Sequence, residues 1–234
     1  MGIWNNLFFE PLYNALIFLI NILPDAGLAI VSLTIVVKLI LFPIQTKSIK
    51  SQIELKKIEP EVQKIKEEYK DKEEQAKKTF ELYKNKKINP FSGCLLLLIQ
   101  LPIIIALYQV FLQDFSADHS YLYNFLSFPE NINYTFLGFL DIREKSIVLA
   151  VLTGLSQFFQ TRLMMGRTAS SSPSGSGFGQ DLAKTMNMQM KYFLPVFIAF
   201  VASRLPSAVA LYWTTSNLFG VLHEWYLKKK SEKE

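Results

Sequence analysis

Apolar residues in this chain gather into long blocks separated by polar segments. Residues 26–44, 91–113, 146–165, 188–203 and 207–227 form five such blocks. Most have the roughly 20 residues that a helix needs to cross a hydrocarbon core of about 30 Å, and the 188–203 block is near the lower limit. The pattern predicts an all-α polytopic membrane protein with five transmembrane helices, in a core that covers residues 25–227. We expect the bilayer to be thinned beside the short 188–203 span.

Charge is distributed unevenly between the connecting segments. Residues 45–88 hold 13 lysines and nine acidic residues, whereas 114–145 hold five acidic residues against Arg143 and Lys145. The 166–187 loop and the 228–234 tail are also basic. Lysine and arginine accumulate on the cytoplasmic side of membrane proteins. This asymmetry predicts an external N-terminus and a cytoplasmic C-terminus.

Residues 1–24 form a further apolar stretch with one polar stripe. Asn6, Glu10 and Asn14 recur every four residues and therefore share one face of a helix. A helix of this kind is suited to lying in the membrane interface. We favour an interfacial amphipathic helix, with a sixth span as the alternative, and the stretch lacks the basic start and cleavage site of a signal peptide.

The charged 45–88 segment has helical periodicity. Ile58, Val62, Ile65 and Tyr69 follow an i, i+4, i+7, i+11 spacing that gives a helix one apolar stripe. The stripe breaks at residues 70–72 and resumes afterwards. We predict a cytoplasmic helical hairpin, a surface that could meet a ribosome, a targeting receptor or a substrate. The Ser/Gly/Pro-rich 166–187 loop is predicted to be flexible.

Recognisable catalytic motifs are missing from the sequence. His223-Glu224 resembles the start of a zinc-protease motif, but Leu227 stands where the second histidine belongs. The single cysteine, Cys94, excludes an internal disulfide or a cysteine-based metal site. We therefore expect neither an enzyme nor a resident metal or cofactor, and nothing indicates specific nucleic-acid recognition.

Lys38 is the most unusual residue, because it lies deep in the 26–44 block. A lysine at such a depth costs about 2.5–3.5 kcal/mol on insertion scales. No Asp or Glu lies in the middle of any block to pair with it. We expect a water-filled cavity around Lys38, open to the cytoplasm and lined by the Gln, Thr and Trp residues of the spans: Thr34, Gln100, Gln157, Gln160, Trp213, Thr214 and Thr215.

Several motifs resemble the YidC-type membrane protein insertases, the bacterial relatives of the mitochondrial oxidase-assembly and thylakoid insertases. They are Thr34-Ile-Val-Val-Lys38, the run Asn89-Pro-Phe-Ser-Gly-Cys94, Gln100-Leu-Pro102 and Leu211-Tyr-Trp213 followed by Asn217. The resemblance extends over almost the whole chain and corresponds to the compact form without a large outer domain. The family's positive groove residue is usually Arg, and Lys38 stands at that position.

The resemblance implies a bacterial cell-membrane insertase and chaperone with a hydrophilic groove open to cytoplasm and lipid. It places Lys38, Gln160 and Trp213 on the groove walls, with Gln100, Gln157, Thr34 and Asn217 as further members. The implied partners are the lipid bilayer and nascent membrane protein clients, especially those with short acidic translocated tails. A ribosome, the signal recognition particle receptor and the Sec translocon are further candidate partners.

Two other classes of function remain open from the residues alone. A small transporter or channel could use Lys38 as an intramembrane site, although the chain has no visible internal repeat. A structural subunit of a larger complex is the third possibility, and it predicts that Lys38 can be neutralised without consequence.

Overall fold

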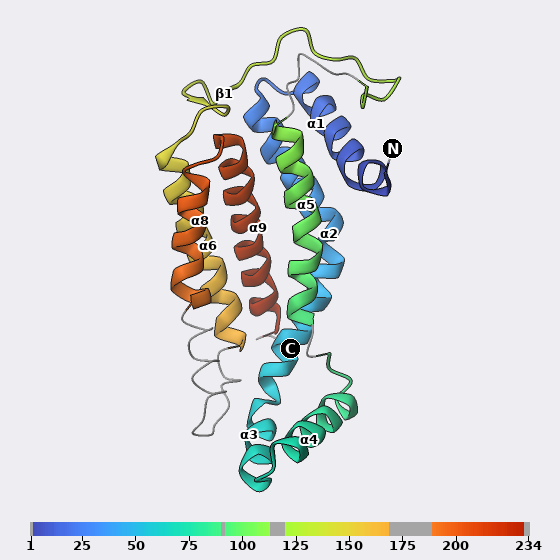
Figure 1. Cartoon of the computed structure of the whole chain (residues 1–234), viewed down its shortest axis with the longest axis vertical. Coiled ribbons are helices and arrows are strands. Elements are labelled where there is room, and N and C mark those ends of the chain that lie inside the picture. Colours follow the sequence, from blue (N-terminus) through green and yellow to red (C-terminus); the bar gives the residue numbers. More distant parts are fainter. Residues whose placement is uncertain (1, 90–91, 113–119, 169–188, 232–234) are drawn as a thin grey trace.

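The computed structural model describes residues 2–89, 92–112, 120–168 and 189–231. Within these ranges the chain is mostly helical, with one small outer hairpin of strands inside a largely irregular segment, residues 120–146. The longer helices run roughly along the long axis of the molecule, and two shorter helices lie at one end (Figure 1). We call this the hairpin end, and the opposite end the outer end.

The N-terminal segment consists of a π-helical turn, η1 (Asn5–Phe9), followed by α1 (Glu10–Ile22). Tyr13, Leu16 and Ile17 of α1 are buried against the rest of the protein, whereas Leu7 and Phe18 are exposed. Asn14, a member of the predicted polar stripe, is buried as well. The stripe therefore does not face solvent along its whole length, contrary to the amphipathic expectation, and whether α1 lies in the interface stays a prediction.

Helix α2 (Ala26–Lys57) is longer than the apolar block from which it was predicted. It continues without interruption past Pro43 and takes up the first 13 residues of the charged 45–88 segment. Within the described residues, α2 contains the one stretch, Ala26–Leu55, that is long and apolar enough to cross a membrane by length and composition alone. The count of five spans stays a prediction.

Two short helices follow at the hairpin end, α3 (Glu59–Glu68) and α4 (Lys72–Asn85). They contact each other, and Lys86 at the end of α4 forms an ion pair of 2.8 Å with Glu61 of α3. Asp71 caps α4 by accepting a hydrogen bond from the backbone of Glu74. Burial between the two helices raises the pKa of Glu59, and nearby Lys66 partly offsets this rise.

The remaining long helices are α5 (Ser92–Leu112), α6 (Ile147–Thr168) and α9 (Ser207–Ser231). A shorter unit, η2 (Gln189–Phe193) continued by α8 (Leu194–Ala202), packs on α6. Gly154 of α6 permits this approach, because a methyl group there would lie 2.7 Å from the Cβ of Ala199.

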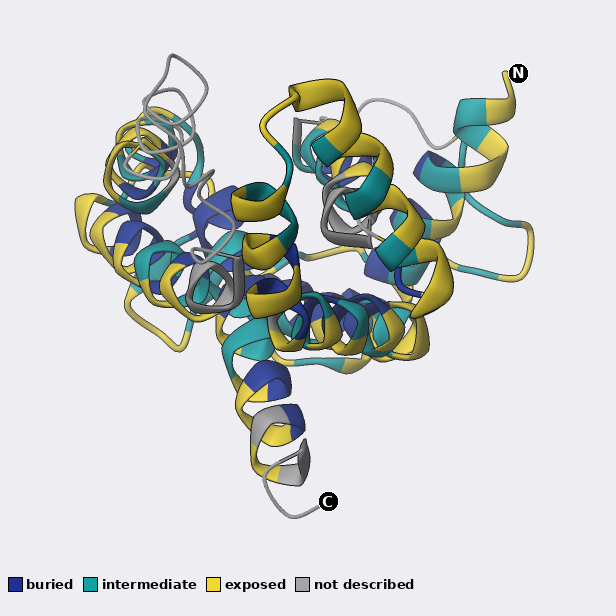
Figure 2. Ribbon diagram, turned by 90° about the horizontal axis from the view of Figure 1, so that it is seen from below, coloured by how far each residue is buried: buried dark blue, intermediate teal, exposed yellow. Residues whose placement is uncertain are grey.

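These helices form a row in the order α5, α2, α9, α6 and α8, in which each helix packs on the next. Figure 1 shows α9 between the α5–α2 pair and the α6–α8 pair. In the view of Figure 2, buried positions turn toward neighbouring helices and exposed positions lie around the outside. Helices α5 and α8 therefore stand at opposite ends of the row.

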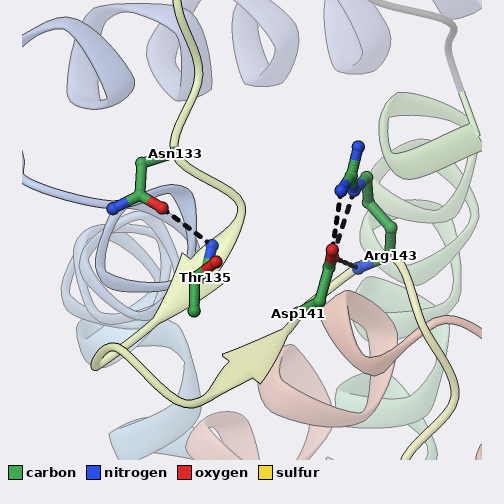
Figure 3. A network of polar contacts seen from close by, with 4 residues as sticks. All are labelled: Asn133, Thr135, Asp141 and Arg143. Carbon is green, nitrogen blue, oxygen red and sulfur yellow. Dashed lines mark hydrogen bonds and ion pairs between the residues drawn. The ribbon is translucent and has the colours of Figure 1, made fainter.

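An outer segment, residues 120–146, connects several helices at the outer end. It carries the two-residue strands β1 (Thr135–Phe136) and β2 (Leu140–Asp141), which pair antiparallel. The hairpin is held by hydrogen bonds from Thr135 to Asn133 and by the Asp141–Arg143 pair (Figure 3). The Arg143 guanidinium also lies over the Tyr134 ring and lowers the pKa of Asp141 by hydrogen bonding to it.

The same outer segment binds the N-terminal helix through Asn14. The Asn14 amide donates to the carbonyl of Tyr121 and accepts from the backbone N–H of Tyr123, both at 2.8 Å. The segment also reaches α9, because the backbone N–H of Ser207 donates to the carbonyl of Glu144. It thereby joins α1 and α9 at the outer end of the row.

Candidate functional site

Lys38 lies in the interior of the helix row. Its exposed fraction is 6%, and α2, which carries it, packs between α5 and α9. A side chain from α5 hydrogen-bonds the ammonium group. The water-filled cavity expected around Lys38 stays a prediction.

That side chain is Gln100. The Lys38 ammonium donates a hydrogen bond of 3.1 Å to Oε1 of Gln100, and Nε2 of Gln100 donates one of 2.5 Å to the hydroxyl of Tyr212 on α9. Tyr212 is 3% exposed and is also hydrogen-bonded to Ser216. One carboxamide thus connects three helices, using both its acceptor and its donor.

Lys38 has no carboxylate partner among the described residues. The ion pairs there join Lys78 to Glu81, Lys86 to Glu61 and Arg143 to Asp141, all outside the interior of the row. The charge is accommodated by an amide alone. A buried ammonium with a neutral partner can still gain electrostatic energy by binding a carboxylate or a peptide carbonyl.

A second polar cluster lies between α6 and α9. The hydroxyl of Thr153 lies 2.9 Å from that of Thr214, and the amide of Asn217 donates to the hydroxyl of Ser156 at 3.1 Å. Gly220 of α9 lies against the amide at the end of the flexible Gln160 side chain, which would have to shift to admit a methyl group there. These contacts join helices in the way that polar groups do in membrane proteins.

Four of the seven residues predicted as one groove belong to two separate contacts, and the other three belong to neither. Lys38 and Gln100 meet directly, whereas Gln160 and Asn217 belong to the contact between α6 and α9. Thr34 donates to the carbonyl of Ile30 in its own helix, and Gln157 likewise donates to Thr161. Trp213 is half-buried and packs on the apolar core. Whether these residues form one groove wall stays a prediction.

Sequence reasoning missed Tyr212, Thr153 and Ser156 as members of these clusters. Tyr212 stood inside a quoted motif, and its position next to Trp213 was a usable signal. The two hydroxyl residues carried no signal, because Thr and Ser are frequent in apolar helices and become distinctive only when a partner helix is known.

A third cluster, nearer the hairpin end of the same helices, surrounds His223 of α9. Its ring stacks on Phe42 of α2 with centroids 4.0 Å apart, and Nε2 lies 2.9 Å from the hydroxyl of Thr46. Within the described parts of the chain, no group of three or more His, Cys, Asp or Glu residues could hold a metal ion. His223 therefore joins α2 to α9 through ring packing on Phe42 and a polar contact with Thr46.

Comparison with known proteins identifies the family. The model of the 60Kd inner membrane protein family matches residues 18–234. The chain belongs to this family. It is 36% identical over 210 residues to a protein of Clostridium tetani named "Membrane protein insertase YidC", covering 88% of this chain and 83% of that protein.

Relatives of the same name in Francisella tularensis are longer. The protein of subspecies novicida is 34% identical over 204 residues, which cover 87% of this chain but 32% of that relative. A solved structure titled "Active YidC insertase crystal structure with the first transmembrane domain resolved" matches with a TM-score of 0.61 and 25% identity. The match covers 97% of this chain and 47% of the solved chain.

Proposed function

We propose that this protein is a membrane protein insertase that moves client transmembrane segments from the cytoplasm into the bilayer. Membership of the 60Kd inner membrane protein family and the names of its relatives support this class of function. The observation that carries the mechanism is Lys38, a buried ammonium whose described partner is a neutral amide.

The barrier to insertion is the transfer of polar groups into hydrocarbon. Each backbone N–H or C=O that enters unsatisfied costs several kcal/mol. A client tail whose carboxylate or carbonyl binds Lys38 has part of this cost offset at the middle of its path. Lys38 lies six residues from the end of the apolar block, or about 9 Å along the helix axis, so the tail need not cross the whole bilayer at once.

In this proposal the client enters between the two ends of the helix row. Helices α5 and α8 would form the sides of a groove and α9 its floor. The exposed side chains of α8 are apolar: Val196, Phe197 and Phe200. Such a surface suits the apolar part of a client, while the polar tail reaches toward Lys38.

The proposed orientation follows the charges. The lysine-rich α3–α4 unit and the basic tail lie in the cytoplasm, and the outer segment lies on the other side. An exposed aromatic, Phe80, on the otherwise polar α4 offers a contact for a ribosome, a targeting receptor or the Sec translocon.

A reconstitution experiment tests the proposal. Purified protein in liposomes receives a single-span client with an acidic tail, made in a cell-free system, and protease protection of the tail measures insertion. The matched client replaces each tail Asp with Asn. We expect Lys38→Arg to retain insertion, and Lys38→Ala and Lys38→Glu to reduce it, with the larger loss for the acidic client.

The possible outcomes test the electrostatic mechanism and the insertase function separately. Equal insertion by all four forms would exclude the electrostatic mechanism but leave an insertase. Protection no greater than in empty liposomes would contradict the insertase proposal and favour the transporter alternative, which ion-flux measurements on the same liposomes would then test.

A further inference from the structure

The carboxamide of Gln100 occupies the position that a client group needs. Its oxygen accepts from Lys38 and its nitrogen donates to Tyr212, at 3.1 and 2.5 Å. A peptide group has the same two functions, a carbonyl that accepts and an N–H that donates. The side chain of Gln100 therefore reproduces, within the protein, the hydrogen bonding that a client backbone or side-chain amide would make there.

The position of this contact in the helix row strengthens the comparison. Helix α5 is an end member of the row and α9 lies in its middle, and the Gln100–Tyr212 bond joins these two helices next to the Lys38 ammonium, to which Gln100 is also bonded. Lys38 is 6% exposed with the bond in place. A client atom can approach the ammonium from the side of Gln100 only after Gln100 has moved.

Lys38 bonded to Gln100 and Lys38 bonded to a client group should have similar energies, so a client group can replace Gln100. A hydrogen bond between an ammonium and a neutral amide is replaced by one with a client carbonyl of the same chemistry, or by a stronger bond with a carboxylate. Gln100 would leave on a flexible side chain of three torsions. No helix has to unfold for the exchange.

We propose that Gln100 is a built-in competitor that fills the client site when no client is bound. This inference rests on the proposed function and deepens it. The site recognises a group that accepts from Lys38, so clients with uncharged amide-rich tails compete for it as well as clients with acidic tails. Gln100 sets the affinity that a client tail must exceed.

A binding measurement shows whether Gln100 weakens or strengthens the binding of a client tail. The full chain in lipid nanodiscs is titrated with a synthetic single-span peptide whose short tail carries two Asp residues and a fluorophore. If Gln100 fills the site in about nine molecules of ten, Gln100→Leu tightens apparent binding about tenfold. Gln100→Glu pairs permanently with Lys38 and weakens binding by about tenfold or more.

Matched variants control for indirect effects. Gln109→Leu changes the same residue type on the same helix, where it accepts a hydrogen bond from Trp4, and leaves tail binding unchanged. Gln100→Asn is one methylene shorter and cannot reach both Lys38 and Tyr212, so it tightens binding in the same direction as Leu while keeping an amide. A peptide with two Asn residues in its tail shows the same order of variants.

The opposite sign overturns the proposal. Binding that weakens in Gln100→Leu as much as in Lys38→Leu would make Gln100 a direct client contact, and unchanged binding would remove it from the site. Either result contradicts the proposal, provided that Gln100→Leu and Lys38→Leu are both folded.

A second readout does not depend on insertion. Cys94 is the single cysteine, so Cys94→Ser with Ser216→Cys places one thiol beside Tyr212. We expect Gln100→Ala to raise labelling of this thiol by a hydrophilic reagent about tenfold, and Gln109→Ala to leave it unchanged. If Gln100→Ala increases labelling but no client peptide binds, only the proposed insertase function is contradicted. If labelling is unchanged, the proposal that Gln100 fills the client site is contradicted.

Discussion

Replacing Lys38 with methionine should leave the protein as stable as before, or more stable, while insertion of acidic clients falls. Lysine at the centre of a membrane helix costs about 2.5–3.5 kcal/mol. Its hydrogen bond to Gln100 returns about 1.5–3 kcal/mol, the range for a bond with a charged partner. Taking the middle of both ranges, the substitution stabilises the fold by about 1 kcal/mol.

The free energy of unfolding can be measured in bicelles by titration with a denaturing detergent. Methionine keeps the unbranched shape of the side chain, so lost packing contributes little. Lys84→Met, on the exposed face of α4, is the matched control and should change neither stability nor insertion. The double variant Lys38→Met with Gln100→Leu completes a cycle that isolates the energy of the hydrogen bond.

The result that would refute this reasoning is a large loss of stability. If Lys38→Met destabilised the protein by more than about 3 kcal/mol, beyond the range of the hydrogen-bond estimate, Lys38 would stabilise the fold directly. Its charge would then be explained by the fold, without a client. Increased stability with lost insertion is the signature of a group kept for function at a cost to the fold.

Three further predictions concern the framework of the site. Gly154→Val should force α6 and α8 apart and destabilise the protein by about 1–3 kcal/mol by thermal unfolding, whereas Gly220→Ala meets a flexible amide and costs less. Asn14→Leu removes the hydrogen bonds that hold the outer segment and should accelerate its proteolysis, while Asn6→Leu, at an exposed position, should not. The lowered pKa of Asp141 means that its ion pair stabilises the outer hairpin at neutral pH and stops doing so as pH falls through that pKa; carboxyl NMR titration checks the direction, and an unshifted pKa would contradict it.

The helical class of the fold was predictable because blocks of apolar residues and the period of α3 are local properties. The break at residues 70–72 was predicted from the interrupted stripe, and the structure places the end of α3 and the start of α4 there. The bounds of the apolar block did not give the end of α2. Residues 45–57 are charged, and charge marks the limit of an apolar block without ending a helix, so α2 continues to Lys57.

The candidate site was also predictable only in part. Lys38 was identifiable from the sequence, since a lysine within an apolar block is costly in any fold. Gln100 was identifiable only as one polar residue among several. Its pairing with Lys38, 62 positions away, depends on how α5 packs against α2, and no local pattern encodes that packing.

The sequence by itself determined that this protein is helical, that its apolar blocks suit a membrane and that one buried cation needs an explanation. Only the tertiary structure decided what surrounds that cation. Lys38 meets the amide of Gln100 because α2 packs between α5 and α9, and a hydrogen bond between distant residues forms only where packing brings donor and acceptor within about 3 Å.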